Sequence, residues 1–276
     1  MSLFTQAGIV TGVAVLSIGA LWAARRSPWN ERFAGEVGEH DRAFDFLGVA
    51  FAVLLAFVVI EAYDSYNDAK SGAEQEADAV LKLSRTAEAF PPDDTRRLQG
   101  TLVCYGRAVI EHGWPAMEEG KGSPVVNDWG TRFREETLQL DSDSFIQQAS
   151  FRQLLLEQDE RIEGRRSRLA EAARVVPPPL WFVLLLGAAL TTGWAVRAAD
   201  RRGSFLVQGA VVASVAAMVT SALLLVWFLD HPFSERTGSI TPIEMEHALK
   251  TIAEEDEHQS VEATPPCDEA GRPQPA

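Results

Sequence analysis

Four stretches of the chain contain no charged residue, and each comes close to the length that a helix needs to cross a lipid bilayer. They are residues 7–24, 46–60, 180–196 and 205–229. Crossing about 30 Å of hydrocarbon takes roughly 20 helical residues, and none of the four shows the regular polar face of a surface helix in a soluble protein. Trp22, Trp181 and Trp227 lie near their ends, where aromatic rings favour the headgroup layer. The pattern predicts four transmembrane helices.

The second stretch changes character at Glu61 without any sign that its helix ends there. Acidic residues follow at Asp64, Asp68, Glu74 and Glu76, and Gly72 is the first helix-weakening residue after the apolar part. We therefore predict that this helix leaves the membrane and continues into water.

The region between the second and third stretches repeats apolar residues at helical spacing, as in Leu98, Leu102, Tyr105 and Val109, and no part alternates as a strand would. We predict an all-α, polytopic membrane protein with a helical extramembrane bundle. The expected divisions are an N-terminal transmembrane helix with its connecting loop, the second transmembrane helix, the helical extramembrane domain, a transmembrane hairpin, and an acidic C-terminal tail. Their residues are 1–43, 44–63, 64–179, 180–229 and 230–276.

The tail carries eleven Asp and Glu residues against three Lys and Arg residues, a net of −8 within the chain total of −14. One helix is expected, because Thr241 can act as its N-cap, Pro242 suits its first position and Glu244 completes a capping box. From Glu254 onward the composition predicts disorder.

Arginines favour one orientation in the membrane. Residues 25–43 contain four and the connection from Arg197 contains three, so the positive-inside rule places both connections in the cytoplasm, and residues 61–179 with both termini outside. Six Lys and Arg residues near the membrane on the opposite side weaken this prediction. The first stretch could be a cleaved signal peptide, but Arg25 and Arg26 follow it rather than precede it, as in an uncleaved anchor.

Motifs for chemistry are scarce. Cys104 and Cys267 have no metal-site spacing, and a disulfide between them requires that both face an oxidising compartment. His112 is interpreted as a packed or capping residue, and no phosphate-binding loop, zinc-protease or serine-hydrolase motif is present. We expect no enzyme activity, no cofactor or metal, and no nucleic-acid partner. Gly8 and Gly12 form a G-x-x-x-G pair that predicts close helix packing, within the chain or between copies.

Several segments together resemble the bacterial family of bestrophin-like membrane proteins over roughly residues 40 to 255. They are "FLGVAFAVLLAFVVIEAYDSYNDAKSGAEQEADAV", "YGRAVIEHGWPAM", "RRSRLAEAARVVPPPLWFVLLLGA" and "DHPFS". Gly113 and Glu235 depart from the family pattern. The resemblance implies a homo-oligomer, a pentamer in true bestrophins, located in the bacterial inner membrane. It also implies a pore lined by the second helix with an apolar neck, and a cytoplasmic helical region, which opposes the arginine count.

Two functions follow as expectations. In an ion channel, the candidate pore-lining residues recur at three- and four-residue steps and place an apolar constriction before carboxylates that attract cations. They are Leu54, Phe57, Glu61, Asp64 and Asp68. The alternative is a non-conducting scaffold or sensor that binds a partner through residues 64–179, in which case the carboxylates are only the solvated face of an emerging helix. The expected partners are the lipid bilayer, further copies of the chain and inorganic ions.

Overall fold

The computed structural model describes residues 3–26, 37–173, 176–199, 203–234, 236–259 and 265–274. The described chain is helical, which confirms the all-α prediction, and four of its helices are long and apolar enough to cross a membrane. The chain divides into two compact units. The first comprises Met1–Asp64, Val175–Asp230 and Arg236–Gly238, and the second comprises Ser65–Arg174, His231–Glu235 and Ser239–Ala276.

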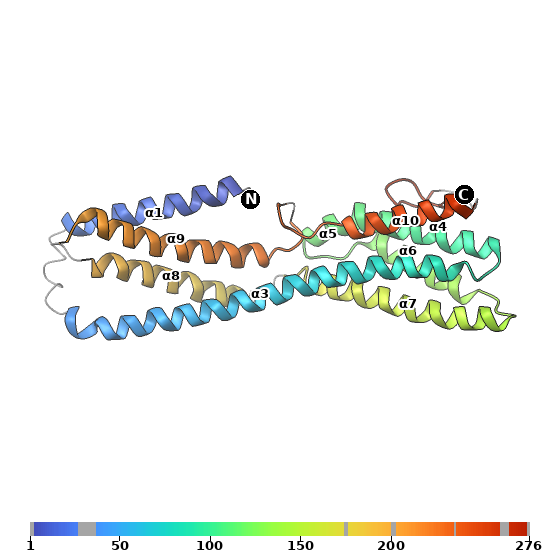
Figure 1. The fold of residues 1–276 in the computed structure, drawn as a ribbon, viewed down its shortest axis with the longest axis horizontal. Helices are drawn as coiled ribbons and strands as arrows, with labels where there is room; N and C mark the ends of the chain where they lie inside the picture. The colour runs from blue at the N-terminus through green and yellow to red at the C-terminus, as the bar shows by residue number, and fades with distance from the viewer. Residues whose placement is uncertain are drawn as a thin grey trace. The chain divides into compact units, whose positions relative to one another are not determined.

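The first unit contains the four candidate spans. They are α1 (Leu3–Arg26), the first part of α3 (Val37–Ala87), α8 (Pro178–Ala198) and α9 (Phe205–Leu229). Helix α1 packs along α9, and α8 contacts α9 on another side (Figure 1). Phe51 of α3 packs against Gly187 of α8, where a Cβ atom would lie 2.3 Å from the ring, so only glycine allows this approach. Apolar side chains of α3, α8 and α9 thus share one cluster that includes Val58, Leu184 and Val226.

Polar groups at the ends of these spans find partners within the unit. Arg25, at the end of α1, donates hydrogen bonds to Gln208 Oε1 at 2.9 Å and to the carbonyl oxygen of Gly203. Asp230, directly after α9, accepts a hydrogen bond from the backbone N–H of Val176 at 2.9 Å, just before α8. These contacts satisfy charges where the apolar helices end.

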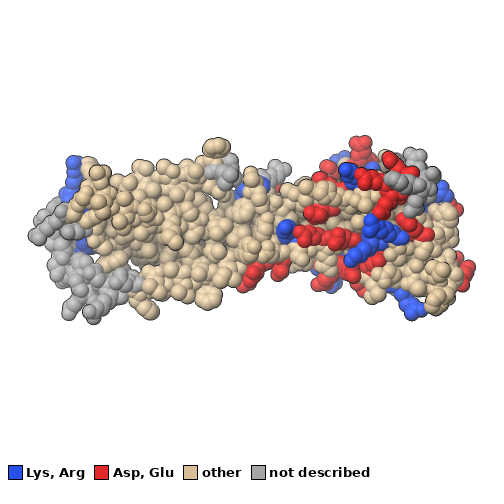
Figure 2. Space-filling model, in the orientation of Figure 1, with Lys and Arg blue, Asp and Glu red and all other residues tan. Residues whose placement is uncertain are grey.

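The second unit is built from the continuation of α3 and the helices between the second and third spans, joined by one C-terminal helix. These are α4 (Pro92–Ala108), the π-helix η1 (Val109–Gly113), α5 (Trp114–Glu118), α6 (Pro124–Leu138), α7 (Phe145–Ala170) and α10 (Ile243–Gln259). Figure 2 shows charged side chains gathered over this unit, whereas the visible surface of α1, α8 and α9 is almost free of them.

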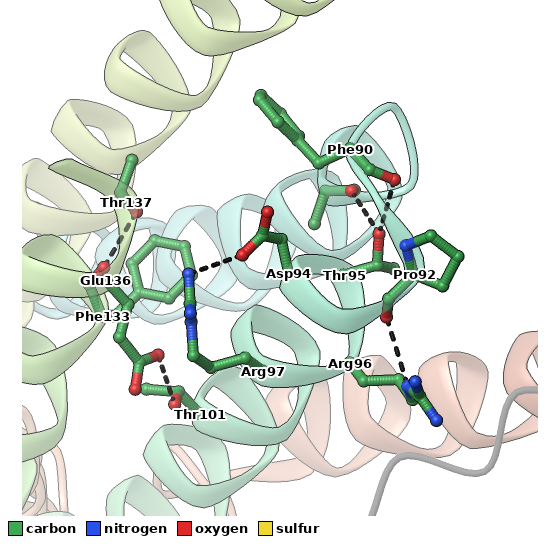
Figure 3. Close-up of polar contacts among 11 residues, drawn as sticks. Phe90, Pro92, Asp94, Thr95, Arg96, Arg97, Thr101, Phe133, Glu136 and Thr137 are labelled. Carbon is green, nitrogen blue, oxygen red and sulfur yellow. Dashed lines mark hydrogen bonds and ion pairs between the residues drawn. The ribbon is translucent and has the colours of Figure 1, made fainter. Parts of the chain in front are cut away.

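Side-chain hydrogen bonds fix the turn from α3 into α4. Thr95 donates to the carbonyl oxygens of Ala87 and Phe90, at 2.9 and 3.2 Å, and so satisfies acceptors that the end of α3 leaves open (Figure 3). Further along, Thr101 of α4 donates to Glu136 of α6 at 2.7 Å. The two helices are thereby held at a defined register.

Helices α3 and α7 cross at a pair of glycines. A Cβ atom on Gly72 would lie 2.7 Å from the backbone nitrogen of Arg168, and one on Gly164 would lie 2.7 Å from the backbone nitrogen of Glu76. The two backbones are in direct contact at this point, because any larger residue would separate them.

The end of the chain differs from the predicted disorder. Helix α10 continues past Glu254 to Gln259, with Met245, Ala248 and Ile252 buried in the core of the second unit. Residues 265–274 then form a short hairpin that a disulfide between Cys104 and Cys267 ties to α4. The acidic composition was misleading because long-range packing and a covalent bond, rather than local hydrophobicity, order these residues.

Candidate functional site

One face of α3 is left uncovered by the described part of the chain. Phe57, Glu61, Asp64 and Asp68 are all exposed. Steps of four, three and four residues bring these side chains within roughly 60° of one another around a helix of 3.6 residues per turn. We call these four residues the open face of α3.

A neighbouring side of the same helix is buried, at Val58, Ala62, Ser65 and Ala69, and lies about 100° around the helix axis from the open face. Burial on one side fixes the rotation of α3 about its axis. The open face therefore flanks the packed side of α3, and does not point directly away from it.

Leu54 was expected on this face, but the structure places it at the edge. It is half-buried and packs with the apolar cluster of α3, α8 and α9. Three residues before Phe57, it is rotated by about 60° from that ring, which turns it toward a cleft of about 710 Å³ beside α8. The structure thus brings together four of the five candidate residues.

Phe57 and Glu61 also border a small pocket of about 260 Å³ beside the start of α8. Its other walls are the apolar side chains of Val58, Ala62, Val176 and Leu180. The first carboxylate of the open face thus stands at the edge of an apolar surface, and the phenyl ring lies one helical turn before it.

A buried polar cluster lies on α3 beyond the open face, inside the second unit. Arg168 of α7 pairs with Glu76 of α3 at 2.6 Å, and each side chain is only 1% exposed. Tyr105 of α4 donates its hydroxyl to the other carboxylate oxygen of Glu76 at 2.5 Å. Burial, together with the Glu76 charge, raises the pKa of Tyr105, so the phenol stays a neutral donor at physiological pH.

Aromatic and sulfur groups complete the surroundings of Arg168. Its guanidinium lies 4.7 Å from the ring centroid of Trp114 and within 2.9 Å of the Met117 sulfur. Trp114 meets Phe233 edge to face at 5.9 Å and donates its indole N–H to the carbonyl oxygen of Ile240. The buried guanidinium of Arg168 is thereby in contact with the Glu76 carboxylate, the electron-rich face of the Trp114 ring and the Met117 sulfur.

The sequence did not predict this cluster as a unit, although its members were visible. Glu76, Tyr105, Met117, Arg168 and Phe233 lie in the separate segments that carry the family resemblance. The signal available in the sequence was that all five residues lie in these segments, which the fold brings together.

The structure gives no evidence for a metal centre. Among the residues that the structure describes, no three His, Cys, Asp or Glu side chains are arranged so that they could hold a metal ion. His112 lies in η1, and its buried Nε2 has no hydrogen-bond partner within the described chain.

Comparisons with known proteins agree with this architecture. Residues 12–238 match the bestrophin-like domain. The structure of a bacterial bestrophin homologue from Klebsiella pneumoniae superposes with a TM-score of 0.73 at 17% identity, covering 89% of this chain and 97% of the homologue. A point variant of that homologue gives a TM-score of 0.71 at 16% identity, with 88% and 99% covered. No curated protein sequence matches significantly. Because the family's domain spans most of its length, the chain belongs to the bestrophin-like family of membrane proteins.

Proposed function

We propose that the protein is an ion channel of the bacterial inner membrane, in which several copies surround an axis lined by α3. The observation that carries this proposal is the open face of α3, which presents an exposed phenyl ring followed by three levels of carboxylates. Burial of the neighbouring side fixes the rotation of the helix, so these exposed side chains contact water, lipid or another copy of the chain.

The order of residues on this face suits cation passage. A ring of Phe57 side chains would form an apolar neck, which blocks ions by excluding water. Rings of Glu61, Asp64 and Asp68 at its mouth would add a negative potential that grows with the number of subunits. Cations would be concentrated there and anions repelled.

Small residues of α1 support an assembly of several copies. A Cβ atom on Gly8 or Gly12 would meet no other part of the described chain within 4 Å. Gly8 and Gly12 therefore do not mediate close packing against another described helix of the same chain. G-x-x-x-G surfaces let helix backbones approach closely in lipid, and the pair is available for contact with a neighbouring copy.

The proposal is tested by ion flux and reversal potential in liposomes that contain the purified protein. Phe57→Ala should raise the flux, because it widens the neck. The double variant Glu61→Gln with Asp64→Asn should shift the reversal potential toward that of a non-selective pore, because it leaves one carboxylate level of three.

Matched controls are available for both changes. Phe182 on α8 is as exposed as Phe57, at 67% each, so Phe182→Ala removes an equal ring from another span and should leave the flux unchanged. Asp128 is an exposed carboxylate on α6, and Asp128→Asn should not alter selectivity. Liposomes that stay impermeable with every assembled variant would rule out conduction.

A non-conducting scaffold or sensor is the second candidate function. Phe145 and Ile146, at the start of α7, are 83% and 69% exposed in the second unit. Apolar side chains at such positions favour contact with another protein. This candidate would gain if the assembled protein fails to conduct and the variants Phe145→Ser and Ile146→Ser abolish a partner interaction.

A further inference from the structure

Cys104 and Cys267 are joined although 163 residues separate them in the sequence. Cys104 lies on α4, and Cys267 lies in the C-terminal hairpin. Both residues are buried. The disulfide is therefore part of the folded core of the second unit, and is not a surface bond between two thiols that happen to lie close together.

The hairpin has its own fold, which presents Cys267 in a defined position. Cys267 pairs with Pro273 across the hairpin, and the backbone N–H of Gln274 donates to the carbonyl oxygen of Pro266. Asp268 accepts a hydrogen bond from the backbone N–H of Arg272 at 2.7 Å, which closes the turn.

The hairpin is also seated on α4 and α6 by contacts independent of the sulfurs. Gly271, with a positive φ of 73°, packs so closely that a Cβ atom would lie 2.5 Å from the backbone nitrogen of Ala108. Its carbonyl oxygen accepts the indole N–H of Trp129 at 2.7 Å, and Arg107 donates to the carbonyl oxygen of Asp268. These contacts would hold the two thiols together before they are oxidised.

We infer that Cys104 and Cys267 are a site of oxidative modification, and that the second unit therefore lies on the extracytoplasmic side of the membrane. Formation of the bond removes two protons and two electrons from the two thiols, and a disulfide donor of that compartment accepts them and becomes a dithiol. Disulfides form and persist in such oxidising spaces, whereas the cytoplasm keeps thiols reduced.

The arginine distribution is independent of the cysteines and favours the same side. Residues 25–43 and 197–202, which include the adjoining helix ends, carry seven arginines against six Lys and Arg residues near the membrane on the other side, so the positive-inside rule favours retention of these two segments in the cytoplasm. Four spans then return both termini to the outer side, together with the hairpin. This orientation is opposite to the one that the resemblance to true bestrophins implies, and it holds whether or not the protein conducts ions.

Counting thiols in the unmodified protein is the first test. Cells are quenched with acid, denatured, and treated with a polymer-linked maleimide that adds a gel shift for each free thiol. We expect no shift before reduction and two additions after it, and two additions without reduction in cells that lack extracytoplasmic disulfide-forming enzymes. Free thiols in protein from normal cells would overturn the assignment, and no variant is needed for that result.

Labelling of intact cells tests the compartment directly. In a chain with Cys104→Ser and Cys267→Ser, a single cysteine is introduced by Lys121→Cys or by Ser204→Cys, both at exposed positions. A membrane-impermeant maleimide should label the first and should label the second only after the cells are opened. The reverse pattern would place the second unit in the cytoplasm even if the disulfide forms.

Discussion

Arg168 is the residue on which several helices of the second unit converge. Its charge is buried, and Glu76, Trp114 and Met117 supply its contacts from α3 and α5. A buried ion pair adds little net stability over an apolar replacement, but loss of one partner leaves an uncompensated charge in a low-dielectric interior. A small net contribution of the intact pair is therefore compatible with a large loss of stability when one partner alone is removed.

Removal of the arginine alone should be costly. Arg168→Met should lower the free energy of unfolding by about 3–5 kcal/mol, because the Glu76 carboxylate remains buried without its cation. Adding Glu76→Gln should recover part of this loss, since the amide is neutral and still accepts the Tyr105 hydroxyl. Denaturant unfolding in detergent, followed by tryptophan fluorescence, measures both.

An exposed ion pair supplies the control for this cycle. Arg96 pairs with Asp93 on the surface of α4, so Arg96→Met should cost less than about 1 kcal/mol. Equal losses for Arg96→Met and Arg168→Met would contradict a special role for the buried cluster.

At the scale of the helix, α3 is the element that joins the open face to the buried cluster. It has 51 residues, so it is about 75 Å long at 1.5 Å per residue. Glu61, Asp64 and Asp68 lie on the same unbroken helix as Glu76. The same helix thus contributes residues to both compact units.

The glycine crossing should tolerate no added methyl group. Gly72→Ala should destabilise the protein by about 1–3 kcal/mol, as overpacking does, although alanine favours an isolated helix over glycine. Gly193→Ala is the matched change, because a Cβ atom at this helical glycine of α8 would meet nothing within 4 Å. Thermal unfolding of both variants should show a loss for the first and none for the second.

At the scale of the whole molecule, the four apolar helices determine where the protein resides. Few residues of these helices are buried within the chain, and large apolar side chains such as Phe57, Phe182 and Leu206 are exposed. In water this surface would favour aggregation, whereas in lipid it carries no cost.

The protein should stay with the membrane fraction when cells are extracted with alkaline carbonate. Mild detergent should release particles that contain more than one copy of the chain, which light scattering with detergent correction can count. Release by carbonate would contradict the four spans, and a monodisperse single copy would contradict the proposed shared axis while leaving the fold intact.

Features that depend on local sequence were predictable, and features that depend on distant pairing were not. The spans and the all-α class followed from charge-free stretches, and exposure of Phe57 and Glu61 agrees with helical spacing. The Glu76–Arg168 pair and the Cys104–Cys267 bond join residues 92 and 163 positions apart. The helical spacing of apolar residues in the sequence gives no information about such long-range contacts. The predicted disorder after Glu254 was wrong for the same reason. Amino-acid composition indicates whether a segment folds in isolation, and does not indicate whether distant parts of the chain order it.

The contact between Gly72 and Gly164 also limits how the second unit can move. Two helices whose backbones touch at one point can change their crossing angle by rotating about that point, with little change in the atoms in contact there. Sliding along each other is opposed by the hydrogen bond from the Ser167 hydroxyl to the carbonyl oxygen of Asp68 and by the Arg168–Glu76 pair, because both would have to break. Any rearrangement of α7 over α3 is therefore a pivot about this crossing, with Arg168 and Glu76 one turn from its centre.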